Sequence, residues 1–393
     1  MGVSKKIMDA IEQSLWIRKM FEEGESRKEI YGEKNVFDFS LGNPNLEPPT
    51  EFKLILQNLA NDSREGLHCY TPNAGYKDTR KAVADYLTEH SSQIFTFDEI
   101  VMTVGASGAL NIILKTILDP DDEVIIPIPC FMEYKNYVDN HHGVPRFIKS
   151  KPDFSLDLYK IKEVMNEKTK AVLINSPHNP TGRIYSCKEL SALVSLMEQY
   201  SEKRRSPIYL ISDESYKKIV FDRVLVPSIT DIYKNSFIVT SFSKELSLPG
   251  ERIGYVALSP AMEDREIVAN GLSLCNRLLG FTNAPALMQR AITSLLNVSV
   301  DIDTYQKKRD MLCDGLASLG YEFIKPQGAF YLFPKSPISD DARFVSVLED
   351  ENILTVPGSS CGCPGYFRIA YCVADSTIIN SMVGFSRAID KFR

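Results

Sequence analysis

The chain has 393 residues, of which 44% are hydrophobic and 24% are charged, and this is the composition of an ordinary globular protein. The length suggests two or three domains, and the composition excludes a fibrous, collagenous or disordered chain. The 45 basic and 51 acidic residues leave a net charge of −6, which argues against a protein that coats nucleic acid.

The first twenty residues predict an amphipathic helix of the mature chain, because charged residues interrupt its apolar positions and leave no signal-peptide core. No apolar run approaches the roughly 18 residues of a membrane span, so we expect no contact with a membrane. We expect Trp16 and the apolar positions of this helix to pack as a lid over a cleft of the protein or against a dimer partner. Those positions are Ile7, Ile11 and Leu15.

Apolar runs typical of buried strands alternate with amphipathic helices through the middle of the chain. Helices are predicted where apolar residues recur every three or four positions, at 76–90, 105–118 and 187–200. Short buried strands are predicted at 99–104, 123–128, 171–175, 208–213, 237–241 and 252–258. This alternation predicts an α/β domain with a mostly parallel sheet that helices cover on both faces.

The pattern changes after about residue 280. A long charged helix is predicted at 301–319, strands of a separate small sheet at 329–333 and 367–371, and a closing helix at 376–392. We therefore predict three segments. Residues 1–50 form an N-terminal segment that belongs to the small domain and the lid, residues 51–280 form the large domain, and residues 281–393 form the small domain.

Eight cysteines are spread from Cys69 to Cys372 without a Cys-x-x-Cys pair. This spacing favours a reduced cytoplasmic chain over a disulfide framework or a structural zinc site, so we expect no metal. Cys361 and Cys363 are separated by one residue, and we interpret them as plain buried thiols in preference to a redox or specificity element.

The most informative segment follows the predicted strand 237–241 and contains Ser241, Lys244 and Arg252. Loops at the carboxyl ends of parallel strands are where α/β sheets bind ligands, so Lys244 is expected in a cleft. An amine in such a place can form a Schiff base with a carbonyl compound. The guanidinium of Arg252 and the hydroxyl of Ser241 suit a phosphate.

A second anion site is predicted where the strand 99–104 runs into the helix 105–118. The free backbone N–H groups at that helix start attract anions, and Ser107 adds a hydroxyl. A dinucleotide site is the rival interpretation. It is disfavoured because the Gly-x-Gly-x-x-Gly pattern is absent.

Asp213 ends the apolar strand 208–213, which places a carboxylate at the ligand edge of the sheet. A carboxylate there can accept a charge-assisted hydrogen bond from a protonated nitrogen of a ligand. The rival role for Asp213 is a helix N-cap. Tyr216, just after Asp213, and Phe131 are further candidates for the binding site, and simple core packing is the rival interpretation of each.

Seven segments match the motifs of one family in chain order: Phe39–Pro44, Tyr70–Gly75, Gly105–Ser107, Ser176–Gly182, Asp213–Tyr216, Ser241–Gly254 and Phe367–Ile369. Together they resemble the pyridoxal-phosphate-dependent aminotransferases of class I/II, which have fold type I and include aspartate aminotransferase. The resemblance runs from about residue 37 to 372. It implies a large domain with a mostly parallel seven-stranded sheet between helices, and a smaller α+β domain.

The resemblance also implies roles for single residues. Lys244 would carry pyridoxal 5'-phosphate as an aldimine and move the substrate's α-proton, with Asp213 and Tyr216 as its catalytic partners. The implied cofactor-binding residues are Tyr70, Ala106, Ser107, Phe131, Asn179, Asp213, Tyr216, Ser241, Lys244 and Arg252. The implied substrate-binding residues are Gly42, Asn179 and Arg368, of which Arg368 grips the α-carboxylate. Tyr70 would reach the cofactor of a second subunit, which implies a homodimer with shared active sites.

The implied reaction moves an amino group from an L-amino acid to a 2-oxo acid by a ping-pong mechanism. The alternative is a carbon–sulfur β-lyase or another enzyme of the same fold, such as a decarboxylase, and a non-catalytic binding protein is a more distant one. The amino donor stays open between aspartate, aromatic and neutral amino acids. Ser107 stands where aspartate-preferring relatives often have a lysine, and Arg277, Arg18 and Arg27 are the candidate side-chain ligands.

Overall fold

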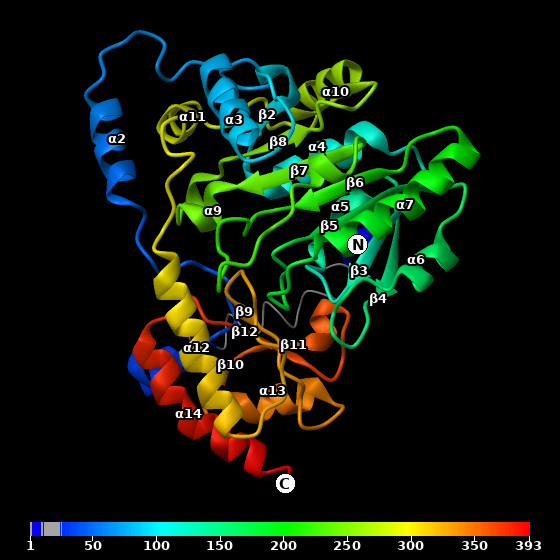
Figure 1. The fold of residues 1–393 in the computed structure, drawn as a ribbon. Helices are drawn as coiled ribbons and strands as arrows, with labels where there is room; N and C mark the ends of the chain where they lie inside the picture. The colour runs from blue at the N-terminus through cyan, green and yellow to red at the C-terminus, as the bar shows by residue number, and fades with distance from the viewer. Residues whose placement is uncertain (1, 9–10, 12–23, 25) are drawn as a thin grey trace. The chain divides into compact units, whose positions relative to one another are not determined.

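The computed structural model describes residues 2–8, 11, 24 and 26–393, and these form two compact units (Figure 1). The smaller unit comprises the described residues of Met1–Asn43 with Tyr305–Lys325 and Phe330–Arg393, and the larger unit comprises Pro44–Thr304 and Pro326–Ala329. The predicted domain boundaries near residues 50 and 280 stay a prediction, because compactness does not show which stretch folds independently. Trp16, Leu15 and Arg18 lie outside the described residues, so the lid also stays a prediction.

The larger unit is built on a seven-stranded sheet with the order β2-β8-β7-β6-β5-β3-β4. Only β8 runs antiparallel to its two neighbours, and all other pairs are parallel, which confirms the predicted mostly parallel sheet. The strands are β2 (Ile100–Thr103), β3 (Glu123–Ile128), β4 (Val144–Lys149), β5 (Thr169–Asn175), β6 (Tyr209–Asp213), β7 (Ser236–Ser241) and β8 (Gly254–Leu258).

The edge strand β4 is the one strand of this sheet that its sequence did not predict. Only Ile148 of its six residues is fully buried, and Arg146 and Lys149 are exposed. An edge strand packs on one neighbour alone, so it needs no continuous apolar run. Its pairing with β3, from Val144 opposite Glu123 to Lys149 opposite Ile128, defines it instead.

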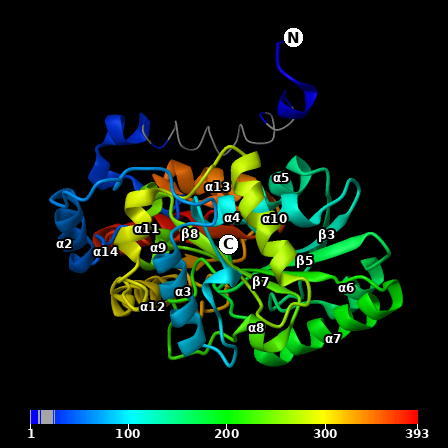
Figure 2. The same cartoon turned by 90° about the horizontal axis from the view of Figure 1, so that it is seen from above.

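Helices cover both faces of the sheet, as predicted (Figure 2). Neighbouring strand residues alternate between two hydrophobic clusters because successive side chains of a strand point to opposite faces. One cluster packs against α3 (Lys77–Glu89), α6 (Leu158–Val164), α7 (Cys187–Arg204), α8 (Ile229–Ile232) and α11 (Ala286–Ile292). The other cluster packs against α4 (Gly105–Ile117), α5 (Glu133–Asn140) and α10 (Arg265–Leu278). The remaining helices of this unit are α2 (Thr50–Ala60) and the short α9 (Phe242–Glu245).

The smaller unit has two small sheets. The pair β1 (Phe37–Asp38) and β10 (Ile353–Leu354) is parallel, and β11 (Val356–Pro357), β12 (Phe367–Ala370) and β9 (Tyr331–Leu332) form an antiparallel sheet. Its described helices include nearly all of α12 (Ile302–Ser318) and α14 (Asp375–Asp390), which match the helices predicted at 301–319 and 376–392, and α13 (Asp341–Asp350), which was not predicted. Aromatic contacts among Tyr321, Phe344, Phe367 and Phe385 fill its interior.

None of the described helices is both long and apolar enough to cross a lipid bilayer.

Candidate active site

Asp213 is the last residue of β6 and is buried. A turn follows it and no helix begins there, so the N-cap role considered for this residue does not apply. Its backbone carbonyl accepts a hydrogen bond of 2.8 Å from Nδ2 of Asn175, which ends the neighbouring strand β5. Asp213 therefore lies at the carboxyl edge of the parallel sheet, where such sheets bind ligands.

Three donors hold the carboxylate of Asp213. The hydroxyl of Tyr134 donates to Oδ2 at 2.7 Å, and the hydroxyl and backbone N–H of Ser215 donate to Oδ1 at 2.7 and 3.1 Å. Burial raises the pKa of Asp213, and the hydrogen bonds from Ser215 and Tyr134 oppose that rise. The donors favour the ionised form, which is the form that pairs with a protonated ring nitrogen.

The predicted phosphate turn is the start of α4, and its first residue, Gly105, has φ of +76°. A Cβ atom there would lie 2.9 Å from Nη2 of Arg252, so the absence of a side chain lets the guanidinium approach the helix start. A hydrogen bond of 2.8 Å from Nη1 of Arg252 to the carbonyl of Pro249 orients the guanidinium. Cation and helix N-terminus thus meet in one place, and that combination suits a phosphate.

Ala106 and Ser107 follow in the first turn of α4 and are half-buried. The hydroxyl of Tyr137 donates a 3.0 Å hydrogen bond to Oγ of Ser107. Ser241 belongs to the same region, because it ends β7 opposite Gly254 of β8, two residues beyond Arg252. The structure therefore brings the predicted phosphate-binding residues together at one edge of the sheet.

Lys244 lies on α9, the short helix that follows β7 directly, and its side chain is half-buried. The register pairs Asp213 with Val239, so β7 ends just beyond the level of Asp213 and Lys244 leaves the sheet at the same edge. The next residue, Glu245, is buried and forms an ion pair of 3.2 Å with Lys218, which anchors α9 to the body of the unit.

Asn179 and Tyr216 are both buried in the larger unit. The backbone N–H of Asn179 donates to Oδ1 of Asn175 at 2.7 Å, which ties the loop after β5 to the strand end beside Asp213. Tyr216 lies in the turn that begins after Asp213.

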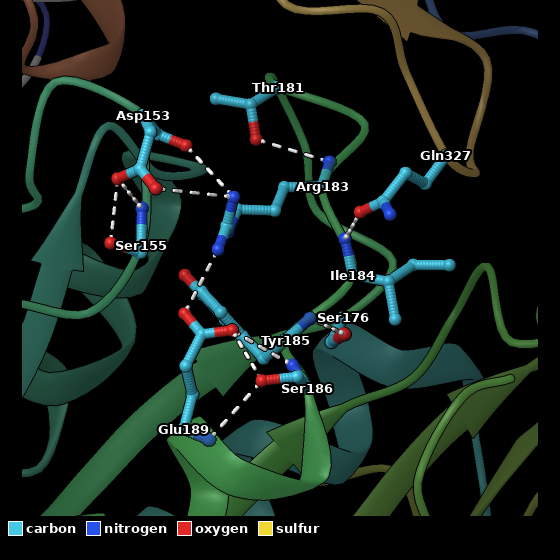
Figure 3. A network of polar contacts seen from close by, with 10 residues as sticks. All are labelled: Asp153, Ser155, Ser176, Thr181, Arg183, Ile184, Tyr185, Ser186, Glu189 and Gln327. Carbon is cyan, nitrogen blue, oxygen red and sulfur yellow. Dashed lines mark hydrogen bonds and ion pairs between the residues drawn. The ribbon is translucent and has the colours of Figure 1, made fainter. Parts of the chain in front are cut away.

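A polar network fixes the rest of the loop that carries Asn179 (Figure 3). Arg183 donates to the carbonyl of Asp153 at 3.0 Å and to Oε1 of Glu189 at 3.1 Å. The backbone N–H of Ile184 donates to Oε1 of Gln327 at 3.1 Å. These hydrogen bonds anchor the loop that carries Asn179 to Asp153, Glu189 and Gln327, as a preorganised binding loop requires.

Phe131 and Tyr70 are the exposed members of the predicted set. The ring of Phe131 is 38% exposed and stands edge-on to the ring of Tyr134, with centroids 5.6 Å apart and planes at 87°. Tyr70 is 86% exposed. Both rings thus present a face or edge that a ligand or a second chain can cover.

In the smaller unit, Arg368 lies on β12, and its Nη2 donates to the carbonyl of Ser40 at 2.8 Å. Its guanidinium lies 4.9 Å from the ring centroid of Tyr331. A Cβ atom at Gly42 would lie 1.8 Å from the hydroxyl oxygen of Tyr331, so only glycine fits there. The predicted carboxylate-binding residues Gly42 and Arg368 therefore share one environment around Tyr331.

Of the three candidate side-chain ligands, Arg18 lies outside the described residues. Arg277 is exposed in the last turn of α10, which agrees with a helix-surface role. Arg27 donates to the carbonyl of Glu349 at 2.7 Å and to Oδ1 of Asn352 at 3.2 Å.

Sequence reasoning missed Tyr134, Tyr137, Ser215, Asn175 and Tyr331. Two tyrosines three residues apart, just after the predicted stacking residue Phe131, were the one available signal. The partners of the missed residues depend on strand order and register, which no local pattern encodes.

The arrangement in the larger unit fits pyridoxal phosphate. A buried carboxylate with anchored donors suits the ring nitrogen, and the site formed by the α4 start and Arg252 suits the phosphate. Lys244 lies at the same sheet edge, and an ε-amine suits the aldehyde.

The sequence matches the family described as aminotransferase class I and II over residues 34–382. The probable aspartate/prephenate aminotransferase of Aquifex aeolicus is 31% identical over 374 residues, which are 91% of this chain and 92% of the relative. These matches confirm the predicted family.

Solved structures of similar fold support the same family. The crystal structure of an amino transferase from Eubacterium rectale has a TM-score of 0.95 and 36% identity, with all of both chains covered. The aspartate aminotransferase from Thermotoga maritima has a TM-score of 0.86 and 27% identity, with 99% of this chain and 100% of that one covered. The fold is thus that of the aspartate aminotransferases, and the chain is an enzyme that belongs to the family of class I and II aminotransferases.

Proposed function

We propose that the protein is a pyridoxal-phosphate-dependent aminotransferase that moves an amino group from an L-amino acid to a 2-oxo acid by a ping-pong mechanism. The observation that carries the proposal is the carboxyl edge of the central sheet. There the buried carboxylate of Asp213, the α4 start with Arg252, and Lys244 occur together.

We propose binding residues for each group of the cofactor. The backbone of Ala106 and Ser107, the hydroxyl of Ser241 and the guanidinium of Arg252 would bind the phosphate. Asp213 would bind the ring nitrogen, and Asn179 and Tyr216 would bind the phenolic oxygen. Phe131 would cover the ring face, and Lys244 would hold the cofactor covalently.

Lys244 is also the proposed acid and base. When bound, pyridoxal phosphate withdraws electrons from the substrate carbon that loses its proton. The ε-amine of Lys244 would take that α-proton at Nζ and would return it in the second proton transfer. Asp213, held by Tyr134 and Ser215, would act as the carboxylate that keeps the ring nitrogen protonated.

Substrate binding is proposed for Arg368, with Gly42 and Asn179. A guanidinium offers two parallel donors to a carboxylate, so Arg368 would grip the α-carboxylate bidentately and orient the α-carbon. All amino acids and 2-oxo acids carry that carboxylate, so one grip serves both halves of the reaction.

We further propose a homodimer in which the exposed Tyr70 completes the cofactor site of the partner subunit. An aromatic ring that is 86% exposed is a natural interface residue. The cytoplasmic location that cysteine usage predicts stays a prediction.

The decisive experiment uses Lys244→Ala protein. Wild-type protein supplied with pyridoxal phosphate should be yellow and should convert an amino acid and a 2-oxo acid into the exchanged pair. Since positioned proton transfer contributes about 10²–10⁴-fold and the covalent link adds to it, the variant should lose essentially all turnover. Transamination retained in pure Lys244→Ala protein contradicts the proposal.

Activity assays also distinguish an aminotransferase from the alternative, a carbon–sulfur β-lyase, and identify the amino donor. A carbon–sulfur β-lyase would release pyruvate from cystathionine or cysteine without any 2-oxo acid acceptor. An aminotransferase would need the acceptor. Aspartate, an aromatic and a neutral amino acid should each be tested against 2-oxoglutarate, pyruvate and oxaloacetate.

A further inference from the structure

Helix α5 carries two tyrosines, Tyr134 and Tyr137, that contact opposite ends of the proposed cofactor site. They are three residues apart, so they lie on the same side of the helix. The hydroxyl of Tyr134 donates to Oδ2 of Asp213 at 2.7 Å, and the hydroxyl of Tyr137 donates to Oγ of Ser107 at 3.0 Å. One helix thus touches the proposed ring-nitrogen partner and the proposed phosphate turn.

Tyr134 is a permanent donor. Its side chain is buried, and burial together with the nearby Asp213 carboxylate raises the pKa of Tyr134 well above its usual value. The hydroxyl therefore keeps its proton at any physiological pH. It supplies one of three hydrogen bonds that oppose the effect of burial on the pKa of Asp213, and removing it would make that carboxylate easier to protonate.

Tyr137 directs the hydroxyl of Ser107. A serine hydroxyl has one proton to donate and accepts through its lone pairs. Because Tyr137 donates to Oγ of Ser107, the Ser107 proton is left to be donated elsewhere, and accepting one hydrogen bond strengthens the next in a chain. An anion at the start of α4 is the acceptor that this arrangement favours.

We propose that Tyr134 and Tyr137 are positioning residues, through which α5 controls ring-nitrogen binding by way of Asp213 and phosphate binding by way of Ser107. The inference rests on the proposed function, since it takes pyridoxal phosphate as the ligand. It adds a feature that no motif predicts: each tyrosine supports the binding of a different group of the cofactor, Tyr134 the ring nitrogen and Tyr137 the phosphate.

Three ligands separate the two roles: pyridoxal phosphate, pyridoxal, which lacks the phosphate, and a deaza analogue with carbon in place of the ring nitrogen. Their dissociation constants are measured by absorbance titration of cofactor-free protein. Tyr137→Phe should weaken pyridoxal phosphate about five- to thirtyfold and leave pyridoxal unchanged. Tyr134→Phe should weaken pyridoxal phosphate and pyridoxal by about the same factor and leave the deaza analogue unchanged.

The pH dependence supplies a second readout. In Tyr134→Phe protein the carboxylate of Asp213 takes up a proton more readily, so the loss of pyridoxal phosphate affinity on acidification should begin at a higher pH than in wild type. In Tyr137→Phe protein the affinity for pyridoxal phosphate should begin to fall at the same acidic pH as in wild type, because the hydroxyl of Ser107 does not titrate in this range.

Tyr233→Phe is the matched control. Its hydroxyl donates to the carbonyl of Ile208 at 2.6 Å, next to the opposite end of β6, so it loses a buried phenol hydroxyl outside the site. Affinities of the α5 variants that equal those of this control, or a Tyr134→Phe variant that weakens all three ligands alike, overturn the inference. If wild-type protein does not bind pyridoxal phosphate, the proposed function itself has failed and the inference falls with it.

Discussion

Asp213 illustrates at the scale of one residue how function and stability oppose each other. Burial raises the pKa of its carboxyl group, so ionisation of this group costs more free energy in the folded protein than in the unfolded chain. Its contribution to stability is therefore full below the unfolded pKa, and it is lost as the pH rises through the folded pKa. The protonated ring nitrogen of the proposed ligand is the partner that would pair the charge of the ionised carboxylate.

Asp213→Asn removes that charge and leaves the size of the side chain nearly unchanged. We expect turnover to fall about 10- to 150-fold, the effect of losing a charge-assisted hydrogen bond of about 1.5–3 kcal/mol. Cofactor-free variant protein should be more stable than wild type at pH 7, and this difference should disappear near pH 3. Urea unfolding at several pH values and steady-state kinetics test both statements, and a variant that is less stable at pH 7 and equally active contradicts them.

At the scale of the secondary-structure element, α4 relates backbone geometry to the proposed phosphate site. Its first residue, Gly105, has a positive φ, and its missing Cβ leaves room for the guanidinium of Arg252. The helix start contributes free N–H groups, and Arg252 contributes a full charge. The glycine allows the helix start and the guanidinium to lie side by side, which is the arrangement that the proposed phosphate site needs.

Gly105→Ala tests this coupling. The new methyl group would displace the guanidinium of Arg252, so affinity for pyridoxal phosphate should fall about tenfold or more while affinity for pyridoxal stays the same. Gly280→Ala is the matched control, because Gly280 has a similar φ of +81° with open space where its Cβ would lie. Both variants should lose about 1 kcal/mol of stability from backbone strain. Equal cofactor affinity in the two variants would count against a role for Gly105.

At the scale of the whole molecule, the proposed chemistry is divided between two compact units. The larger unit holds the proposed cofactor residues, and the smaller unit holds Gly42 and Arg368. Each set has its own support, since three donors hold Asp213 and the ring of Tyr331 lies beside Arg368. Cofactor affinity and substrate affinity are therefore expected to respond to different substitutions.

Arg368→Lys tests this division. Lysine keeps the charge and loses the planar pair of donors, so kcat/KM for the amino acid should fall about 10- to 150-fold. Affinity for pyridoxal phosphate should match that of wild type, as it should in the control Arg343→Lys, which alters an exposed arginine of the same unit. Titration and steady-state kinetics on both variants provide the measurements. A large loss of cofactor affinity in Arg368→Lys would contradict the division.

The ordered motifs from Phe39 to Ile369 were enough to predict the family and the mostly parallel sheet, because each motif is a local pattern of residue types. They were not enough to find β4, whose polar edge position hides it from any search for apolar runs. The roles assigned to Lys244, Arg252 and Arg368 stay predictions until the variants are measured.

Tertiary structure alone decided which side chains support the site. Tyr134 and Asp213 are 79 positions apart, and Tyr137 and Ser107 are 30 apart. Their contacts exist because strand order brings β6 and the start of α4 within reach of α5, an arrangement that depends on the packing of the whole sheet. Local residue patterns therefore determined the kind of chemistry expected here, and long-range packing determined the side chains that hold its parts in place.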